Sequence, residues 1–259
     1  HMKLAAQWVV ENGADLIDIN MGCPAKKVVG GASGSALMRD LDHALHLIEA
    51  TLSGARGIPV TVKMRLGWDA ASMNAPALAR RAQEVGAAWV TVHGRTRDQF
   101  YEGTANWSEI KAVKDAVDIP VVANGDLIHA NQHARMLWES RADAVMIGRG
   151  ATGRPWFPAW LEGTSPSGFE SWSFEMLVCG HYEEMLSYYG MQAGLRHARK
   201  HLGWYLDRLT NLDPRIHEHR SNLLRSNDAV YVSAEMRRLT EGVTIGDVDP
   251  ELSHLRKAA

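Results

Sequence analysis

The chain has 259 residues, a formal net charge of −2 at pH 7, and 46% hydrophobic and 22% charged residues. This balance is ordinary for a folded protein and argues against a polypeptide that coats nucleic acid through overall positive charge, although a local basic face remains compatible with it. No apolar run is long enough to cross a bilayer, so the sequence predicts no membrane-spanning helix.

Cys23 and Cys179 are the two cysteines of the chain. Two thiols so far apart make neither a disulfide framework nor a metal cluster, so we expect no metal site and a reducing, cytoplasmic setting. Cys179 lies in an apolar helical stretch and is expected to be a core residue.

Five short apolar runs predict buried β-strands, because each is followed by glycine, proline or polar residues. The first opens the stretch 15–25, and the others are 60–64, 89–93, 121–124 and 144–148. Helices are predicted at 3–13, 36–52, 74–85, 107–116 and 130–139, which gives a repeat of about 30 residues, the size of a βα unit. This alternation predicts a parallel sheet covered on both faces.

The predicted strands end in polar residues or glycine, at the edge where α/β folds bind ligands. These residues are Asn20 and Cys23, Lys63 and Arg65, His93 and Arg95, Asn124 and Asp126, and Gly148 and Arg149. Polar groups from consecutive strands favour an α/β fold of the (β/α)8 TIM-barrel type over a doubly wound sheet, which uses mainly one crevice and a glycine-rich first turn.

A closed barrel needs eight βα units, and the sequence contains five. We therefore expect that only the last five units are present and that about three strands precede them in a longer parent. Open parallel edges are prone to pairing with another chain, so strand-edge pairing or a domain-swapped dimer is expected of the shortened chain.

The pattern changes after the last predicted strand. Glycine, serine and proline at 163–168 predict a linker, and helices are predicted at 174–189, 191–208, 214–226 and 229–239. These helices predict a small bundle, and the tail from Gly242 is expected to be partly loose. The predicted domains are thus a partial barrel at 1–163 and a helical domain at 164–259.

Cys23 lies between Gly22 and Pro24, directly after the first predicted strand. The proline ring fixes its own φ and restricts the residue before it, so the cysteine sits on a stiff loop at a strand's carboxyl end. A free cysteine is more often a small buried hydrophobe, but this loop position favours chemistry.

Lys63 and Arg65 are two positions apart on one predicted strand, so their side chains point to the same side of the sheet. Two buried cations need an anionic or electron-rich partner, and either a salt bridge to an acidic neighbour or a bound ligand would supply it. Glycines in the runs 123–126 and 147–150 follow the last two strands, where barrels commonly bind phosphate through backbone N–H groups.

Five blocks, read in order, carry a resemblance to a known family: DINMGCPAKK at 18–27, KMR at 63–65, VHGRT at 92–96, ANGD at 123–126 and MIGR at 146–149. They resemble the signature of bacterial tRNA-dihydrouridine synthases over residues 3 to about 210. The cysteine block looks like the B-type branch. Dihydroorotate dehydrogenases share the architecture that this resemblance implies, but not the cysteine block with a helical C-terminal domain.

The resemblance implies an FMN-dependent barrel in which NADPH reduces FMN and hydride passes to C6 of a uracil flipped out of tRNA. Cys23 matches the loop cysteine that supplies a proton to C5, and this role makes chemical sense because hydride addition leaves enolate-like charge. Asn20, Arg65 and Arg95 would hold the uracil, because a flipped base is read by hydrogen bonds to its edge. Cofactor contacts fall on Lys63, His93, Asn124, Gly125, Asp126, Gly148 and Arg149.

The resemblance also implies that the helical domain binds tRNA. Arg196, Arg199 and Lys200 share a predicted helix face beside histidines and aromatic residues, and they are candidates for contacts with the tRNA backbone. Lys26 and Lys27, on the cysteine loop, are candidates for nearby phosphates. An ordinary solvated face is the alternative for both groups.

The first strands of the family, with a Pro-Met loop and further flavin and uracil contacts, have no counterpart in the sequence. We therefore predict that this chain binds FMN weakly or not at all, whereas the longer parent is an NADPH-dependent oxidoreductase that reduces a specific tRNA uridine to 5,6-dihydrouridine. Two alternatives are a flavin barrel that acts on free pyrimidines and a non-catalytic RNA-binding fragment.

Overall fold

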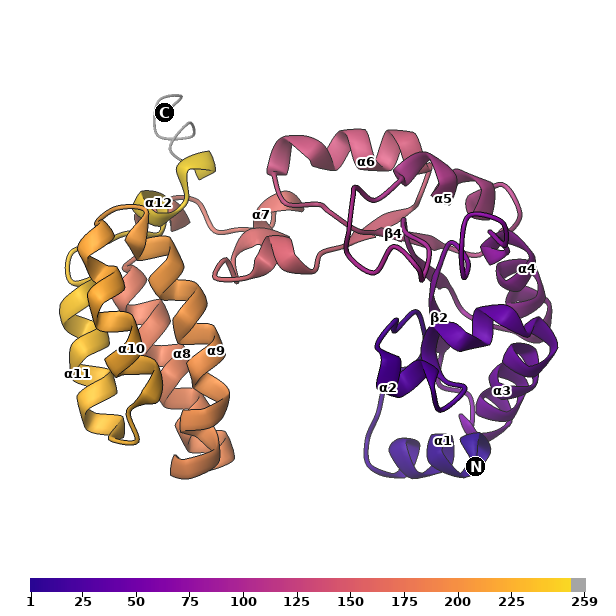
Figure 1. Cartoon of the computed structure of the whole chain (residues 1–259), viewed down its shortest axis with the longest axis horizontal. Coiled ribbons are helices and arrows are strands. Elements are labelled where there is room, and N and C mark those ends of the chain that lie inside the picture. The colour runs from indigo at the N-terminus through magenta and orange to yellow at the C-terminus, as the bar shows by residue number, and fades with distance from the viewer. Residues whose placement is uncertain (253–259) are drawn as a thin grey trace. The chain divides into compact units, whose positions relative to one another are not determined.

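A computed structural model describes residues 1–252 of the chain. The chain divides into two compact units, His1–Arg149 and the residues from Gly150 onward. Figure 1 shows strands alternating with helices in the first unit and a group of helices in the second. Among the described residues, no helix combines the length and the apolar character that crossing a membrane requires.

The first unit is built on one parallel sheet whose five strands lie in chain order. The strands are β1 (Ile17–Met21), β2 (Val60–Arg65), β3 (Val90–His93), β4 (Val121–Asn124) and β5 (Ala144–Met146). The predicted strands and their parallel pairing are confirmed. Because the strand order contains no reversal, the described sheet has no topological switch point and is not doubly wound. The outer edges of β1 and β5 have no strand partner within residues 1–252, and pairing of those edges with another chain stays a prediction.

Helices cover one face of this sheet, and in Figure 1 they follow one another along one side of the strands. They are α1 (Met2–Glu11), α3 (Leu41–Gly54), α4 (Ala75–Val85), α5 (Trp107–Lys114) and α6 (His133–Ser140). The predicted helix 36–52 is wrong at its start, where a 3₁₀ helix (Gly34–Arg39) precedes α3. Asp40 separates the two, because its side chain accepts a hydrogen bond from the His43 N–H at 2.9 Å and caps α3.

The strand register sorts the side chains onto two faces. Met21, Met64, Val92 and Ala123 lie in one register row and are buried on the helix face. Asn20, Lys63, Arg65, His93 and Asn124 belong to the opposite rows. Connections of one hand between neighbouring strands place the helices on a single face, so the prediction of cover on both faces is wrong for the described residues. On the open face, Asp18, Ala144 and Met146 are exposed.

The second unit is a helical bundle, as predicted. Its longest helices are α8 (Phe174–Tyr189), α9 (Met191–Thr210), α10 (His217–Arg225) and α11 (Ala229–Thr240), with short α7 (Phe157–Leu161) and α12 (Ile245–Val248). Cys179 is buried in the core that these helices share, which confirms its predicted place, and burial raises the pKa of its thiol. The tail is not loose over its described part, because α12 is capped by Thr244 and contributes Ile245 and Val248 to the core.

The boundary between the units lies at 149, whereas the sequence predicted it at 163. Trp156 packs edge-on against Phe174 at 6.2 Å and belongs to the bundle core. Arg154 donates from Nε to the carboxylate of Asp249 at 2.8 Å, and both residues are buried. Phe169, next to the predicted linker, is buried in the same core. The segment 150–163 therefore packs with the helices, although the sequence placed it at the end of the barrel domain.

Candidate active site

The loop that carries Cys23 is held from both sides. The side-chain oxygen of Asn20 accepts hydrogen bonds from the backbone N–H of Gly22 at 3.1 Å and of Cys23 at 3.0 Å. The carbonyl oxygen of Cys23 accepts from the N–H of Ser35 at 3.0 Å and from its hydroxyl at 2.9 Å. Gly34 adopts a φ of +60°, and a Cβ there would lie 2.8 Å from the Cys23 carbonyl oxygen. Only glycine allows this close approach, so the backbone of the half-buried, free cysteine is fixed.

Arg65 links the Cys23 loop to the loop that follows β3. Its Nε donates to the carbonyl of Gly22 at 2.8 Å, and its Nη1 donates to the carbonyls of Thr96 and Phe100 at 2.8 and 2.9 Å. The guanidinium is buried, and burial lowers its pKa, although an arginine stays charged at any physiological pH. Two of its nitrogens are therefore committed to backbone carbonyls, and Nη2 is the atom with no protein acceptor among the described residues.

Lys63 and Asn124 are linked by a hydrogen bond across the open face of the sheet. Lys63 Nζ donates to the side-chain oxygen of Asn124 at 3.1 Å, and Asn124 Nδ2 donates to the carbonyl of Met146 at 2.8 Å. Burial, followed by the charge of Arg65, lowers the pKa of Lys63. A salt bridge was one interpretation of this lysine, but its hydrogen-bond partner in the described chain is a neutral amide. An anionic or electron-rich ligand would therefore satisfy this lysine.

His93 follows in the same row and is neutral. Burial, followed by the charges of Arg65 and Lys63, lowers its pKa to about 3. Arg95 Nη1 lies 3.3 Å from His93 Nε2 and can only donate, so Nε2 accepts and Nδ1 carries the proton. Gly125 has a φ of +118°, and a Cβ there would lie 2.8 Å from the imidazole Cδ2. The close approach of Gly125 thus restricts the imidazole ring, and Nδ1 is its hydrogen-bond donor.

Arg95, Asp126 and Arg149 form an ion cluster beside this row. Arg95 is buried and pairs with both carboxylate oxygens of Asp126 at 2.9 and 2.6 Å, while Arg149 Nη2 donates to the same carboxylate at 2.7 Å. Burial alone would raise the pKa of Asp126, but the hydrogen bonds from Arg95 and from the Ala105 N–H outweigh it and lower that pKa. Arg95 also donates to the carbonyls of Glu102 and Gly103. Its nitrogens are all engaged, which favours a structural role over the predicted uracil contact.

The remaining predicted residues lie on exposed surfaces or in the second unit. Gly148 is exposed, and so are Lys26 and Lys27 on the short helix α2 (Lys26–Val29). In α9, Arg196 and Lys200 are exposed, whereas Arg199 Nη2 donates to the Ser226 carbonyl at 3.1 Å and to Asn227 Oδ1 at 2.8 Å. Arg199 therefore braces the bundle, because it holds the connection between α10 and α11.

Two features of the site escaped the sequence-based prediction. Ser35 is twelve residues beyond Cys23, and no local pattern announces its bond to the cysteine carbonyl. Tyr101 is exposed in the loop after β3, with its ring 5.6 Å from the Arg65 guanidinium, 5.5 Å from that of Arg149 and 6.4 Å from the His93 ring. An aromatic residue in a polar, glycine-containing loop was the signal that could have pointed to it.

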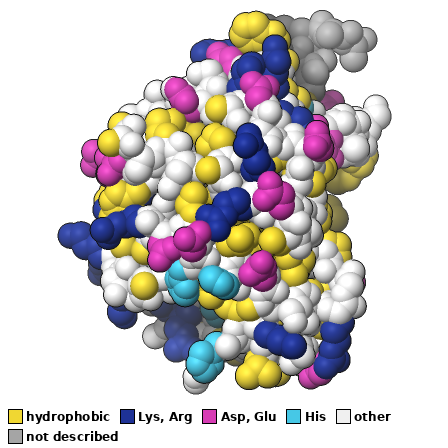
Figure 2. All heavy atoms as spheres, turned by 90° about the vertical axis from the view of Figure 1, so that its right-hand side faces the viewer, with side chains coloured by type: hydrophobic (Ala, Val, Ile, Leu, Met, Phe, Trp, Pro, Cys, Tyr) yellow, Lys and Arg dark blue, Asp and Glu magenta, His cyan; other side chains and the backbone are white. Residues whose placement is uncertain are grey.

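Basic side chains do not form a continuous field on the face of the molecule drawn in Figure 2, where acidic and basic groups are interspersed among the described residues. Within the same residues, no group of three or more histidine, cysteine, aspartate or glutamate side chains is arranged to hold a metal ion.

Residues 1–235 match the family model described as dihydrouridine synthase. The chain belongs to the dihydrouridine synthase family. It is similar to a probable tRNA-dihydrouridine synthase of Rhizobium leguminosarum bv. phaseoli, with 56% identity over 207 residues that cover 80% of this chain and 64% of the relative. A probable tRNA-dihydrouridine synthase of Rhodobacter capsulatus is 54% identical over 80% of this chain and 65% of its own length.

The B-type branch is also among the relatives. A tRNA-dihydrouridine synthase B of Xanthomonas axonopodis pv. citri is 49% identical over 78% of this chain and 62% of the relative. The chain therefore spans less than two thirds of the length of these curated relatives. Among solved structures, 2,3-dimethylmalate lyase is similar with a TM-score of 0.44 and 17% identity over 60% of this chain and 58% of that one, which is too slight a likeness to support an argument.

Proposed function

We propose that the protein of which this chain is part reduces a specific uridine of tRNA to 5,6-dihydrouridine. The first unit, His1–Arg149 (unit 1), would carry the chemistry, and the second, from Gly150 onward (unit 2), would bind tRNA. The observation that supports it most directly is the placement of Cys23, a free thiol on a fixed loop at the carboxyl end of β1. Its neighbours in the sheet, Lys63, Arg65 and His93, supply polar groups on the same open face. We infer the reaction from membership in the dihydrouridine synthase family.

The residues present fit one end of a flavin. Lys63 offers a partly buried ammonium whose pKa is already lowered, and His93 offers an N–H donor at Nδ1, so the two could bind the electron-rich pyrimidine edge of FMN. The backbone N–H groups of Gly125, Asp126 and Gly148 are candidates for its phosphate. The Asp126 carboxylate repels phosphate, so its part in binding is to hold Arg149 in place. The hydride for C6 of the uracil would come from bound FMN that NADPH has reduced.

Cys23 would act as the general acid. Its S–H bond breaks as the new C5–H bond forms, and the thiolate that remains recovers a proton from solvent. Because both the N–H and the carbonyl of Cys23 are fixed, the sulfur can be aimed at one atom of the ring. Asn20 uses its oxygen for the loop, so its Nδ2 is the group left to bind a uracil carbonyl. Arg65 Nη2 is a second donor for the same base edge.

The open sheet would be part of a (β/α)8 barrel in the longer protein. Its singly wound strand order and one-sided helix layer match that architecture. Since the open face leaves Ala144 and Met146 exposed at β5, we propose that this chain alone binds FMN weakly and is poorly active, and that the complete enzyme works in the cytoplasm.

The test is the dihydrouridine content of tRNA, measured by mass spectrometry in a strain that lacks the gene. The full-length parent gene should restore dihydrouridine at one position, and its Cys23→Ala variant should not. Cys179→Ala is the matched control, because that thiol lies in the bundle core. Restoration by Cys23→Ala would remove the proposed role of this cysteine, and failure of the wild-type gene would remove the function itself.

A further inference from the structure

A line of aromatic rings runs along one side of the α8–α9 hairpin. Tyr188 lies edge-on to Tyr189 with ring centroids 4.8 Å apart, and Tyr189 lies 4.5 Å from His197. One helical turn further along α9, His201 contacts His181 at 4.9 Å and Trp204 at 5.2 Å. We call these six residues, from the tyrosine pair to Trp204, the aromatic ladder.

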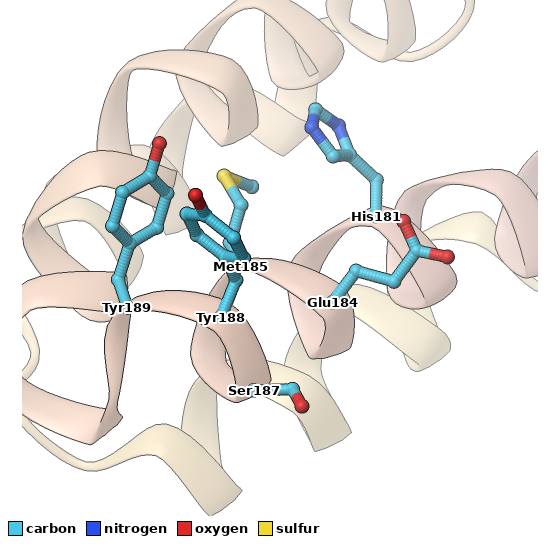
Figure 3. Close-up of a pocket in the computed structure, with 6 residues that line it drawn as sticks. All are labelled: His181, Glu184, Met185, Ser187, Tyr188 and Tyr189. Carbon is cyan, nitrogen blue, oxygen red and sulfur yellow. The ribbon is translucent and has the colours of Figure 1, made fainter. Parts of the chain in front are cut away.

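The tyrosine end of the ladder is open to solvent. Tyr188 is 83% exposed and Tyr189 is 50% exposed. They line a hollow of about 500 Å³, and Figure 3 shows both rings and His181 projecting to the same side of α8 while Ser187 points away. Single exposed aromatic residues are ordinary, but a contiguous set beside a hollow marks an interaction site.

Positive charge runs parallel to the ladder. Arg196 and Lys200 each lie one residue before a ladder histidine on α9 and are exposed, and Lys200 Nζ sits 4.9 Å from the Trp204 ring centroid. Glu184 is the acidic residue on the hollow itself. A basic stripe next to flat rings complements a polyanion with flat bases, whereas an apolar protein partner would not need the charges.

Two of the ladder histidines, His181 and His201, lie in surroundings that disfavour their charged form. Burial lowers the pKa of His181, and burial with the charges of His181 and Lys200 lowers that of His201. Glu184 raises the pKa of His181, but less than burial lowers it. His181 Nδ1 is 2.9 Å from the Tyr205 hydroxyl, which fixes its ring from the core side. The rings of the ladder are therefore flanked by two exposed cations, Arg196 and Lys200.

We propose that the α8–α9 hairpin binds an unpaired run of tRNA nucleotides, with bases stacked on Tyr188 and Tyr189 and phosphates bound by Arg196 and Lys200. The preference for unpaired nucleotides follows from the rings, because a base inside a duplex is stacked between its neighbours and presents no free face. This inference rests on the proposed function, since it takes tRNA as the source of the strand. It assigns recognition to aromatic stacking, beyond contact with the backbone alone.

Binding of a fluorescently labelled ten-nucleotide oligouridylate to the whole chain tests the inference. The variant Tyr188→Ala/Tyr189→Ala should bind about 30-fold more weakly or worse, because it loses two rings and each stacked base contributes at least about 5-fold in affinity. The slope of log affinity against log salt should stay as in the wild type. Arg196→Gln/Lys200→Gln should instead flatten that slope by about 0.7 for each phosphate that the variant no longer neutralises.

Two controls separate stacking from folding. Tyr188→Phe/Tyr189→Phe keeps both rings and should bind like the wild type, and Tyr231→Ala removes a 40% exposed aromatic residue of α11 and should have no effect. An RNA duplex of the same length should bind more weakly than the single strand.

Equal binding by the Tyr188→Ala/Tyr189→Ala variant, preference for the duplex, or no binding of oligouridylate by the wild type would each overturn the inference. None of these results changes the outcome of the dihydrouridine assay, so the proposed function is tested independently of this inference. Conversely, stacking as expected with no dihydrouridine formed by the parent gene would leave the binding site and remove the reaction.

Discussion

The side-chain oxygen of Asn20 lies 3.0 Å from the backbone nitrogen of Cys23, and this hydrogen bond sets the conformation of the loop. Asn20 is the penultimate residue of β1, and Cys23 is the second residue after the end of β1. The strand itself therefore positions the cysteine. Ser35 holds the cysteine carbonyl from the other side. The loop is therefore pre-shaped before any ligand arrives.

Asn20→Ala should release this loop. Two backbone N–H groups lose their acceptor, so the free energy of unfolding should fall by about 1 kcal/mol, and iodoacetamide should alkylate Cys23 several-fold faster. Peptide mass spectrometry measures the rate, with buried Cys179 as the internal reference. Asn20→Asp keeps an acceptor oxygen and should stay close to the wild-type rate. An unchanged rate in Asn20→Ala would show that the hydrogen bond does not restrain the thiol.

Gly34→Ala should be more destabilising than the matched change Gly57→Ala. Both glycines have positive φ angles, +60° and +95°, so both alanines carry the left-handed penalty of about 1–2 kcal/mol. A Cβ at 34 also meets the Cys23 carbonyl oxygen at 2.8 Å, whereas a Cβ at 57 meets nothing within 4 Å. Urea denaturation of the two variants isolates the cost of this close approach, and equal losses of stability would mean that the loop moves aside without cost.

Periodicity and strand ends were enough to predict the sheet and the row of polar residues. Lys63 and Arg65 point to the same face because strand side chains alternate, and the register then brings His93 and Asn124 into the row. The partners within that row were not predictable. Arg95 was expected to hold the base, yet Asp126 occupies it, and such a pair depends on two loops meeting in space.

Longer-range contacts limited the prediction further. Gly34 and Ser35 belong to no motif that the sequence predicts, although they hold the cysteine loop. The bond between Arg154 and Asp249 joins residues 95 positions apart, so the segment 150–163 was assigned to the barrel domain when read locally. Glycine and proline occur both in linkers and in packed turns. Composition therefore does not reveal which domain such a segment packs with, whereas the burial of its side chains does.

The pKa of His93, lowered to about 3 mainly by burial, predicts acid sensitivity of unit 1. Between about pH 6.5 and pH 3 the unfolded histidine binds a proton that the folded one does not, so stability falls as the pH falls through this window. His93→Gln should flatten that dependence relative to the wild type. The exposed His43→Gln serves as the control and should leave it unchanged. Urea midpoints between pH 7 and pH 4 give the slopes, and parallel slopes for wild type and His93→Gln would contradict the assignment.

The buried pair of Arg154 and Asp249 should dominate the stability of unit 2. Their side chains are 2% and 1% exposed, and Asp249 also accepts from Trp156 Nε1 at 2.8 Å. Asp249→Asn leaves a buried guanidinium with less compensation, which costs about 3 kcal/mol, the lower end of the range for such pairs because Glu251 remains 3.6 Å from Arg154. Hydrogen exchange in α8, α9 and α12 should accelerate while unit 1 is unaffected.

A surface pair provides the matched control for this last change. Asp213→Asn breaks the bond to Arg215, which is 85% exposed, and should change the stability far less, because solvent screens an exposed ion pair. Arg154→Leu/Asp249→Leu should recover much of the stability, because a buried ion pair can be replaced by apolar side chains once neither charge is left alone. Similar stability for Asp249→Asn and Asp213→Asn would mean that water reaches Arg154, and that Trp156 and the core aromatics, rather than the ion pair, anchor the segment 150–163 to the bundle.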